Sequence, residues 1–190
     1  MTPPSRTLGI AFSGGTHASY VAGAVVRGDF ALDGLAYDSC SVGGTDATDA
    51  IRDLATSLDR PDVRHVCLAG VAPAWFNLVD LDRLHAALDR PVSAVSYEPS
   101  PGLEPALREA FDGDALADRL AIYRSLPPRQ RVAGLPDEAD PLFVRAVGIE
   151  PADAAATVVA LVREGFRRPE PVRVASIAAS AHREAVATDG

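Results

Sequence analysis

The stretch that decides the fold runs from residue 6 to residue 58 and reads RTLGIAFSGGTHASYVAGAVVRGDFALDGLAYDSCSVGGTDATDAIRDLATSL. Its first part is rich in Val, Ala and Leu, and it is divided at Gly14-Gly15 and Gly28-Asp29, which are typical turn residues. We therefore expect three strands, over 6–13, 19–27 and 32–42. Short turns would join them into an antiparallel meander.

The hydrophobic period changes after the third of these strands. Over 45–58 the apolar residues fall near one helical face, and they are Ala47, Ala50, Ile51, Leu54 and Leu58. Thr45 is the expected N-cap of this helix, and acids follow it in the first turn. The chain thus changes from strand to helix at about this point.

Strands and helices then alternate. We expect a strand over 63–70, a helix over 78–88 and a strand over 91–96, which begins at a proline. Such alternation favours parallel pairing through right-handed crossovers. The order of elements resembles the RNase H-like core. It predicts an α/β fold with a mixed sheet, three antiparallel strands followed by parallel strands, flanked by helices.

The second half of the chain has a less regular pattern. We expect a loop over 97–102, one or two helices over 103–124 interrupted at Asp112-Gly113, and an irregular segment or small hairpin over 126–141. A short strand over 142–147 and helices over 151–164 and 172–187 complete the chain. No internal repeat divides the sequence, and we expect a single domain over 1–190.

The composition limits the functions that the chain can have. Of 190 residues 47% are hydrophobic, and the formal net charge is −8, with 18 basic residues of which none is lysine. Such acidity argues against a broad basic surface for nucleic acid. It is also typical of GC-rich halophiles, in whose concentrated salt surface acids can reflect the solvent rather than a partner. We recognise no membrane span and no signal peptide, and expect a cytoplasmic protein.

Common ligand motifs are absent from the sequence. Cys40 and Cys67 lie in apolar stretches and are expected to be reduced core thiols, and the four histidines are scattered, so a zinc site is not predicted. The segment FSGGTH (12–17) follows a strand but lacks the lysine of a phosphate-binding loop. We interpret it as a plain turn.

The segment GGTDATD (43–49) is more informative. Asp46 and Asp49 lie three residues apart at a helix start, so they would point to a similar side of the first turn. Two carboxylates there suit a functional site. They equally suit a helix start stabilised by acids, because the helix dipole favours negative charge at that end.

Two further segments carry polar residues beside expected element ends. AWFNLVD (74–80) places Asn77 and Asp80 shortly after a strand, where α/β sheets bind ligands, although its aromatic residues suit a core as well. RRPEPVR (167–173) concentrates Arg167, Arg168 and Arg173. Arginine binds phosphate through a bidentate fork, but the segment also suits a solvated entry to the last helix.

Taken in order, these motifs resemble the archaeal family once called DUF99 or UPF0215, also named endonuclease dU, which is related to endonuclease V. The family pattern runs L-G-I-D-D-S, D-G-x-D-A-T-E-x-I, G-F-N-V-V-D, P-V-I-x-V and P-E-P-L-R-x-A. This sequence has LGIAFS (8–13), GTDATDAI (44–51), WFNLVD (75–80), PVSAV (91–95) and PEPVRVA (169–175). The ordered match extends over most of the chain.

The resemblance implies an RNase H-like nuclease that holds one or two Mg²⁺ or Mn²⁺ ions through carboxylates. The ions of such enzymes activate a water and stabilise the leaving oxygen of a phosphodiester. Asp46, Asp49 and Asp80 are the candidate catalytic residues, with Asp46 and Asp80 as metal ligands. The candidate nucleic-acid contacts are Asn77, Arg167, Arg168 and Arg173.

The sequence departs from the family pattern where metal ligands are expected. The first-strand acid falls at Ala11 or Phe12, and the Asp-Gly of endonuclease V falls at Ala69-Gly70. The late Gly-Glu-Ser stretch is not recognisable around 182–184. Because these apolar side chains cannot bind a cation, the surviving acids would hold Mg²⁺ poorly.

Three functions stay open at this point. The first is a Mg²⁺-dependent endonuclease that acts on DNA containing deaminated bases. The second is a non-catalytic paralogue that binds DNA or RNA through the arginines of 167–173. The third is a small-molecule or protein-interaction module, because a fold does not fix a function.

Overall fold

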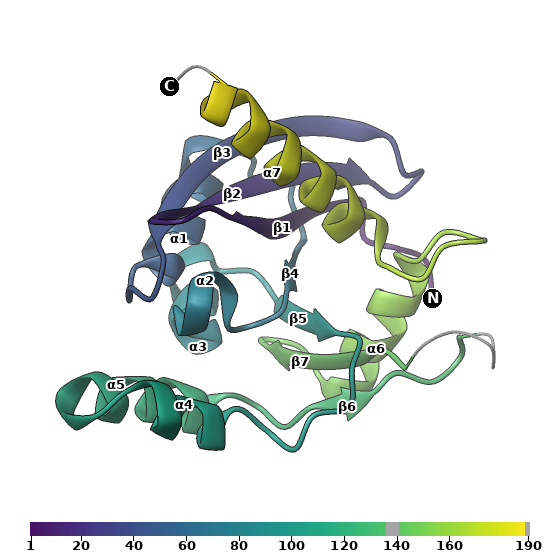
Figure 1. Cartoon of the computed structure of the whole chain (residues 1–190). Coiled ribbons are helices and arrows are strands. Elements are labelled where there is room, and N and C mark those ends of the chain that lie inside the picture. Colours follow the sequence, from purple (N-terminus) through teal and green to yellow (C-terminus); the bar gives the residue numbers. More distant parts are fainter. Residues whose placement is uncertain (136–140, 189–190) are drawn as a thin grey trace.

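The computed structural model describes residues 1–135 and 141–188, and it is built around a mixed sheet (Figure 1). Strands β1 (Arg6–Gly14), β2 (Ala18–Arg27) and β3 (Leu32–Ser41) pair antiparallel. Strand β4 (His65–Ala69) lies parallel to β1, and β5 (Val92–Ser96) lies parallel to β4. The predicted meander and the parallel strands that follow it are thus confirmed.

Two strands extend the sheet beyond β5. Strand β7 (Phe143–Val147) pairs antiparallel with β5, and the two-residue β6 (Gln130–Arg131) pairs antiparallel with β7. The sheet order is β3-β2-β1-β4-β5-β7-β6. The strand expected over 142–147 is confirmed. The segment 126–141, expected to be irregular or a small hairpin, contains only β6, whose partner β7 lies beyond it, and residues 136–140 lie outside the described residues.

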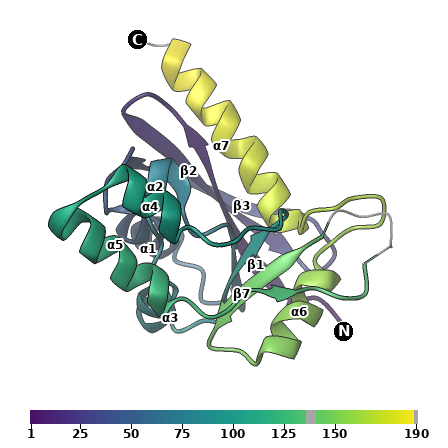
Figure 2. The same cartoon turned by 60° about the horizontal axis from the view of Figure 1, so that its bottom comes forward.

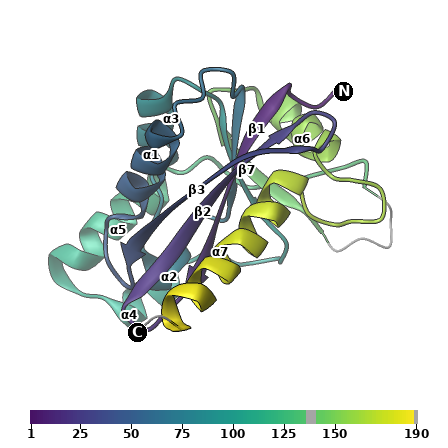
Figure 3. The ribbon, with the colours of Figure 1, turned by 90° about the horizontal axis from the view of Figure 1, so that it is seen from above.

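Helices cover both faces of the sheet. Helices α1 (Ala47–Ser57) and α3 (Leu81–Leu88) lie on one face, and α7 (Glu170–Thr188) crosses the other face over β1 and β2 (Figure 3). The short α2 (Pro73–Phe76) lies beside α4 (Glu104–Ala110) and α5 (Gly113–Ser125) (Figure 2). Helix α6 (Pro151–Ala160) packs against β7.

The two faces of the sheet are packed differently. Between the sheet and α1, large aliphatic side chains such as Ile10, Ile51 and Leu54 form the main core. Beneath α7 the contacts are made by small side chains, namely Ala11, Ala22 and Ala24 of the sheet and Ala175, Ala178 and Ala179 of the helix. The small side chains allow α7 to lie close to β1 and β2.

Two expectations drawn from composition can be compared with the structure. Cys40 and Cys67 are buried and free, as expected for core thiols. Burial raises the pKa of the Cys67 thiol to about 12. Within the described part of the chain, no helix combines the length and the apolar character that crossing a bilayer requires.

His65 on β4 gives the protein a predictable dependence on pH. Its side chain is buried, its Nε2 lies 3.0 Å from Ser93 Oγ, and burial lowers the pKa of His65 from 6.5 to about 4. Between these values the unfolded chain binds a proton that the folded chain does not. We therefore expect the free energy of unfolding to fall by about 3 kcal/mol as the pH is lowered through this range.

Urea unfolding between pH 7.5 and pH 4 measures this effect. The variant His65→Gln should lose this part of the pH dependence, whereas His17→Gln, at an exposed histidine, should keep it. A pH dependence that is identical in both variants would show that His65 is not its source.

Candidate functional site

Asp46 stands between the end of β3 and the start of α1, at the carboxyl edge of the sheet. It occupies the N-cap position that sequence analysis gave to Thr45, but its side chain does not cap α1. The carboxylate turns back to Ser41 and accepts hydrogen bonds from its backbone N (3.0 and 3.2 Å) and its Oγ (3.0 Å). A further bond comes from Asn77 Nδ2 at 2.7 Å.

These hydrogen bonds favour the ionised form of Asp46 and also use much of the capacity of its carboxylate to accept further bonds. Burial alone would raise the pKa of Asp46, but the hydrogen bonds from Asn77 and Ser41 outweigh burial, and the pKa lies below its usual value. An ionised carboxylate has about four acceptor positions. Three donors reach it, Ser41 N, Ser41 Oγ and Asn77 Nδ2, and the Ser41 N–H is shared between both oxygens. A ligand of Asp46 would therefore have to compete with these donors.

Asn77 joins three segments from a fully buried position. Its Oδ1 accepts a hydrogen bond from Ala47 N at 2.9 Å, so Asn77 caps the helix that Asp46 leaves uncapped. Its Nδ2 donates to Asp46 and to Ser41 O at 2.9 Å. Asn77 is thus a positioning residue here, and its side chain is not exposed for the direct nucleic-acid contact that sequence analysis considered.

A left-handed turn leads into Asn77. Ala74, Trp75 and Phe76 have φ values of 48°, 55° and 61°, which are costly for residues other than glycine. The Trp75 side chain is 57% exposed, and one edge of its ring lies against Gly43. A Cβ at Gly43 would lie 2.7 Å from Trp75 Cε3, so glycine is required for the tryptophan to sit there.

Arg119 of α5 holds this turn in place. It is 4% exposed and donates to the carbonyl oxygens of Phe76 (3.1 Å), Gly43 (2.6 Å) and Gly44 (3.0 Å). Its guanidinium lies 3.8 Å from the centroid of the Phe111 ring. Sequence analysis missed Arg119, because no local pattern marks a helix residue whose partners lie 43 to 76 positions away.

Asp49 and Asp80 are linked through Arg83. Asp49 Oδ1 accepts hydrogen bonds from Arg52 at 2.6 Å and from the Arg83 side chain at 2.5 Å. Asp80 caps α3 by accepting from Arg83 N at 2.9 Å, and its own N–H donates to Thr48 Oγ1 at 3.0 Å. The structure therefore brings Asp46, Asp49 and Asp80 to one edge of the sheet, but each carboxylate is engaged with protein donors.

The central strands offer no acid at this edge. Ala11 is 1% exposed and packs beneath α7, whereas Phe12 points to the other face and packs against the main core. Ala69 ends β4. Within residues 1–135 and 141–188, no three His, Cys, Asp or Glu side chains are grouped so that they could hold a metal ion. The Mg²⁺ or Mn²⁺ that the resemblance implies does not fit these donors, since it needs several hard oxygen ligands at one point.

The arginines of 167–173 lie before and within the first turn of α7. Arg173 donates to both oxygens of Glu170 at 2.7 Å, and Arg163 donates to Glu170 at 3.2 Å. Arg173 lowers the pKa of Glu170 against the effect of burial, and Arg163 adds to it. Arg173 is thus committed to a buried carboxylate. Arg167 and Arg168 are exposed, and the Arg168 guanidinium lies 5.0 Å from the centroid of the Tyr97 ring.

A comparison with known protein families identifies the family of this chain. The family model described as Endonuclease dU matches residues 4–183. The chain belongs to the Endonuclease dU family. A relative in Pyrobaculum calidifontis, named UPF0215 protein, is 34% identical over 170 residues, which make up 87% of this chain and 89% of the relative. The resemblance drawn from the ordered motifs is thereby confirmed.

Similarity to solved structures identifies the fold class. A protein of unknown function from Archaeoglobus fulgidus has a TM-score of 0.81 and 27% identity to this Endonuclease dU member, over 93% of this chain and 96% of that one. Endonuclease V of Ciona intestinalis, solved with a 24mer DNA containing an inosine followed by a ribo-adenosine, has a TM-score of 0.63 at 12% identity. That match covers 96% of this chain and 87% of that one. The fold is therefore RNase H-like, as predicted.

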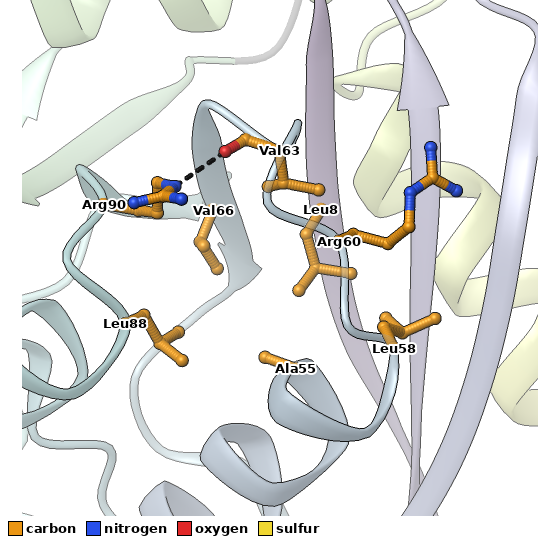
Figure 4. Close-up of a pocket in the computed structure, with 8 residues that line it drawn as sticks. All are labelled: Leu8, Ala55, Leu58, Arg60, Val63, Val66, Leu88 and Arg90. Atoms are coloured by element: carbon orange, nitrogen blue, oxygen red, sulfur yellow. Dashed lines mark hydrogen bonds between the residues drawn. The ribbon is translucent and has the colours of Figure 1, made fainter.

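A pocket lies at the opposite edge of the sheet in this Endonuclease dU member, near the starts of β1 and β4 (Figure 4). Its walls are mainly aliphatic, and Arg60 and Arg90 contribute to them. Arg60 pairs with Asp33 and Asp62, and Arg90 Nε donates to Val63 O at 2.8 Å. The space inside is about 80 Å³, well below the roughly 300 Å³ at which ligand pockets begin. This pocket does not favour a small-molecule function.

Proposed function

We propose that this member of the Endonuclease dU family binds nucleic acid without cleaving it by a metal-dependent reaction. The observation that carries the proposal is the state of Asp46. The acid that best matches the family motif already accepts hydrogen bonds from three donors, Ser41 N, Ser41 Oγ and Asn77 Nδ2. Ala11 and Phe12 occupy the place of the first-strand acid. A metal ion would have to displace those bonds and then find further ligands among apolar side chains.

Two features support nucleic acid as the ligand. The fold is similar to that of an endonuclease V that was solved with inosine-containing DNA. In addition, Trp75 presents an exposed ring beside the Asp46 loop. Arg119 fixes its turn by donating to the carbonyl oxygens of Phe76 and Gly43. A rigid exposed aromatic ring suits stacking with an unpaired base, which contributes about 1–3 kcal/mol per base in known complexes. The proposed ligand is therefore DNA that exposes an unpaired or deaminated base.

Fluorescence anisotropy and a nicking assay together test this function. The probes are short single strands and duplexes that carry hypoxanthine, uracil or a normal base, in a series of KCl concentrations, because such affinities depend steeply on salt. We expect dissociation constants of about 10⁻⁶ to 10⁻⁴ M, the range of weakly specific binding, with single strands preferred. We expect no nicking above a metal-free control in Mg²⁺ or Mn²⁺. A catalytically active endonuclease V serves as the positive control for the substrates.

Two outcomes would overturn the proposal. Metal-dependent nicking that disappears in Asp46→Asn would show that Asp46 gives up its internal bonds and that the protein is an enzyme. The absence of binding to every strand at every salt concentration would exclude the nucleic-acid function itself. Calorimetric titration with Mn²⁺ gives a readout independent of cleavage, and it should show no saturable heat.

A further inference from the structure

Half of the 18 arginines of this acidic protein form a close ion pair with a carboxylate among the residues that the structure describes. The chain has 18 basic and 26 acidic residues. Ion pairs of 3.2 Å or less involve the arginines at positions 6, 27, 52, 60, 83, 108, 124, 163 and 173.

Four arginines without such a partner gather near the carboxyl end of β5. They are Arg129, Arg131, Arg145 and Arg168, called here the arginine cluster. Among the residues that the structure describes, no carboxylate lies within ion-pair distance of any member. The cluster belongs to the same sheet edge as Asp46 and Asn77, because β1, β3, β4 and β5 all end there.

Arg129 wraps around the end of β5. Its Nη1 donates to Ser96 Oγ at 3.2 Å and to the carbonyl of Glu98 at 2.9 Å, and its Nη2 donates to the carbonyl of Ser100 at 3.1 Å. The guanidinium also lies 4.5 Å from the centroid of the Phe143 ring. These contacts hold the side chain in one place, and no carboxylate of the described residues is paired with it.

The other members lie around the same segment. Arg131 is exposed and stands opposite Phe143 in the β6–β7 register, so both side chains point to one face of the sheet. The Arg168 guanidinium lies over the ring of Tyr97, and Tyr97 lies in sequence between Ser96 and Glu98, two of the three residues that bind Arg129. Burial lowers the pKa of Arg145, and the nearby positive charge of Arg129 lowers it further. Within residues 1–135 and 141–188, the cluster therefore concentrates positive charge that no ion pair neutralises.

We propose that Arg129, Arg131 and Arg168 bind backbone phosphates of a nucleic acid that lies along the carboxyl edge of the sheet. The inference rests on the proposed function and names the surface that supplies its charge. Strands in a sheet are about 4.8 Å apart, so β5 lies only about 10 Å from β1 at this edge. A strand whose base meets Trp75 would pass along this edge toward the cluster. Guanidinium groups pair with phosphate oxygens in a bidentate fork, which suits an anion repeated along a chain.

Salt-dependent binding measurements test the cluster. The double variant Arg131→Ser/Arg168→Ser removes two exposed charges and keeps the hydrogen bonds of Arg129. We expect its affinity for a single-stranded oligonucleotide to fall about 10-fold at low salt. The slope of log K against log salt should decrease by about 1.4, since each phosphate contact in a single strand contributes about 0.7. Replacing Glu98 by glutamine should raise the affinity, because it removes an acid from the same segment.

The matched control is Arg27→Ser/Arg64→Ser, which changes the net charge equally at the opposite edge of the sheet. It should leave the salt slope unchanged. If the wild type binds and the two double variants lose affinity equally, the cluster is not the contact surface, although the proposed function stands. If the wild type binds no oligonucleotide, the proposed function itself is wrong. If poly-glutamate of matched charge binds as tightly as the oligonucleotide, the surface recognises acidic chains generally, and the assignment to nucleic acid is overturned.

Discussion

Replacing Asn77 by aspartate is expected to lower the free energy of unfolding by roughly 3–5 kcal/mol at neutral pH, the cost of an unpaired buried charge. The change keeps the shape of the side chain but exchanges the amide Nδ2 for an oxygen. That oxygen would face Asp46 Oδ1 and Ser41 O, which now accept hydrogen bonds at 2.7 and 2.9 Å. Three acceptors would then meet without a proton. Urea unfolding at pH 7 measures the loss.

The same variant has a characteristic response to pH. Burial and the Asp46 charge would raise the pKa of the new carboxyl group in the folded state above its value of about 3.9 in the unfolded chain. The destabilisation should therefore be largest at neutral pH and should shrink as the pH falls toward 4. Asp49→Asn is the control, because it weakens only the solvent-accessible ion pairs with Arg52 and Arg83 and should cost about 1 kcal/mol or less. Equal losses in the two variants would contradict the anchoring role of Asn77.

Replacing Gly9 by alanine is expected to cost about 3 kcal/mol or more, because overpacking against backbone cannot be relieved by a rotamer change. A Cβ at Gly9 would lie 2.1 Å from both the carbonyl carbon and the oxygen of Pro171, at the start of α7. The helix would have to move away from β1 along its length. Chemical unfolding and near-ultraviolet circular dichroism would report this loss of packing.

Gly14 provides the matched control on the same strand. A Cβ there would meet nothing within 4 Å, and its φ lies outside the left-handed region. Gly14→Ala should therefore change stability by less than about 1 kcal/mol, with a slight gain from the reduced entropy of the unfolded chain. A Gly9→Ala protein as stable as Gly14→Ala would mean that α7 does not lie as close to β1 as described.

Much of the fold could be predicted from hydrophobic periodicity and turn residues. The three strands of the meander begin and end within one or two residues of their expected positions, and α1 was displaced by only two residues at its start. That displacement has a physical reason, since Thr45 and Asp46 both suit an N-cap by type. The direction of β7 could not be predicted, because the same five-residue stretch suits either pairing.

The candidate site was harder to predict than the fold. Its acids could be found by type and spacing, but their bonding partners depend on tertiary contacts. Asp46 bonds to Asn77, which lies 31 positions away, and Arg119 reaches Gly43 across 76 positions. The same holds for Arg173. Sequence analysis considered it as a phosphate contact, whereas in the fold it pairs with buried Glu170. A residue type predicts what a side chain can bind, whereas packing decides which partner it meets.

The alanine-lined contact beneath α7 limits which side chains the sheet can hold at position 11. Ala11 lies where the family pattern has an acid, and it is enclosed by Ala24 and Ala175. A carboxylate introduced there alone would be both too large and without a partner, so it would cost several kcal/mol before it could bind anything. An acid at position 11 would thus require a simultaneous change on the opposing helix. A single substitution at Ala11 therefore cannot supply a metal ligand on β1 without loss of packing.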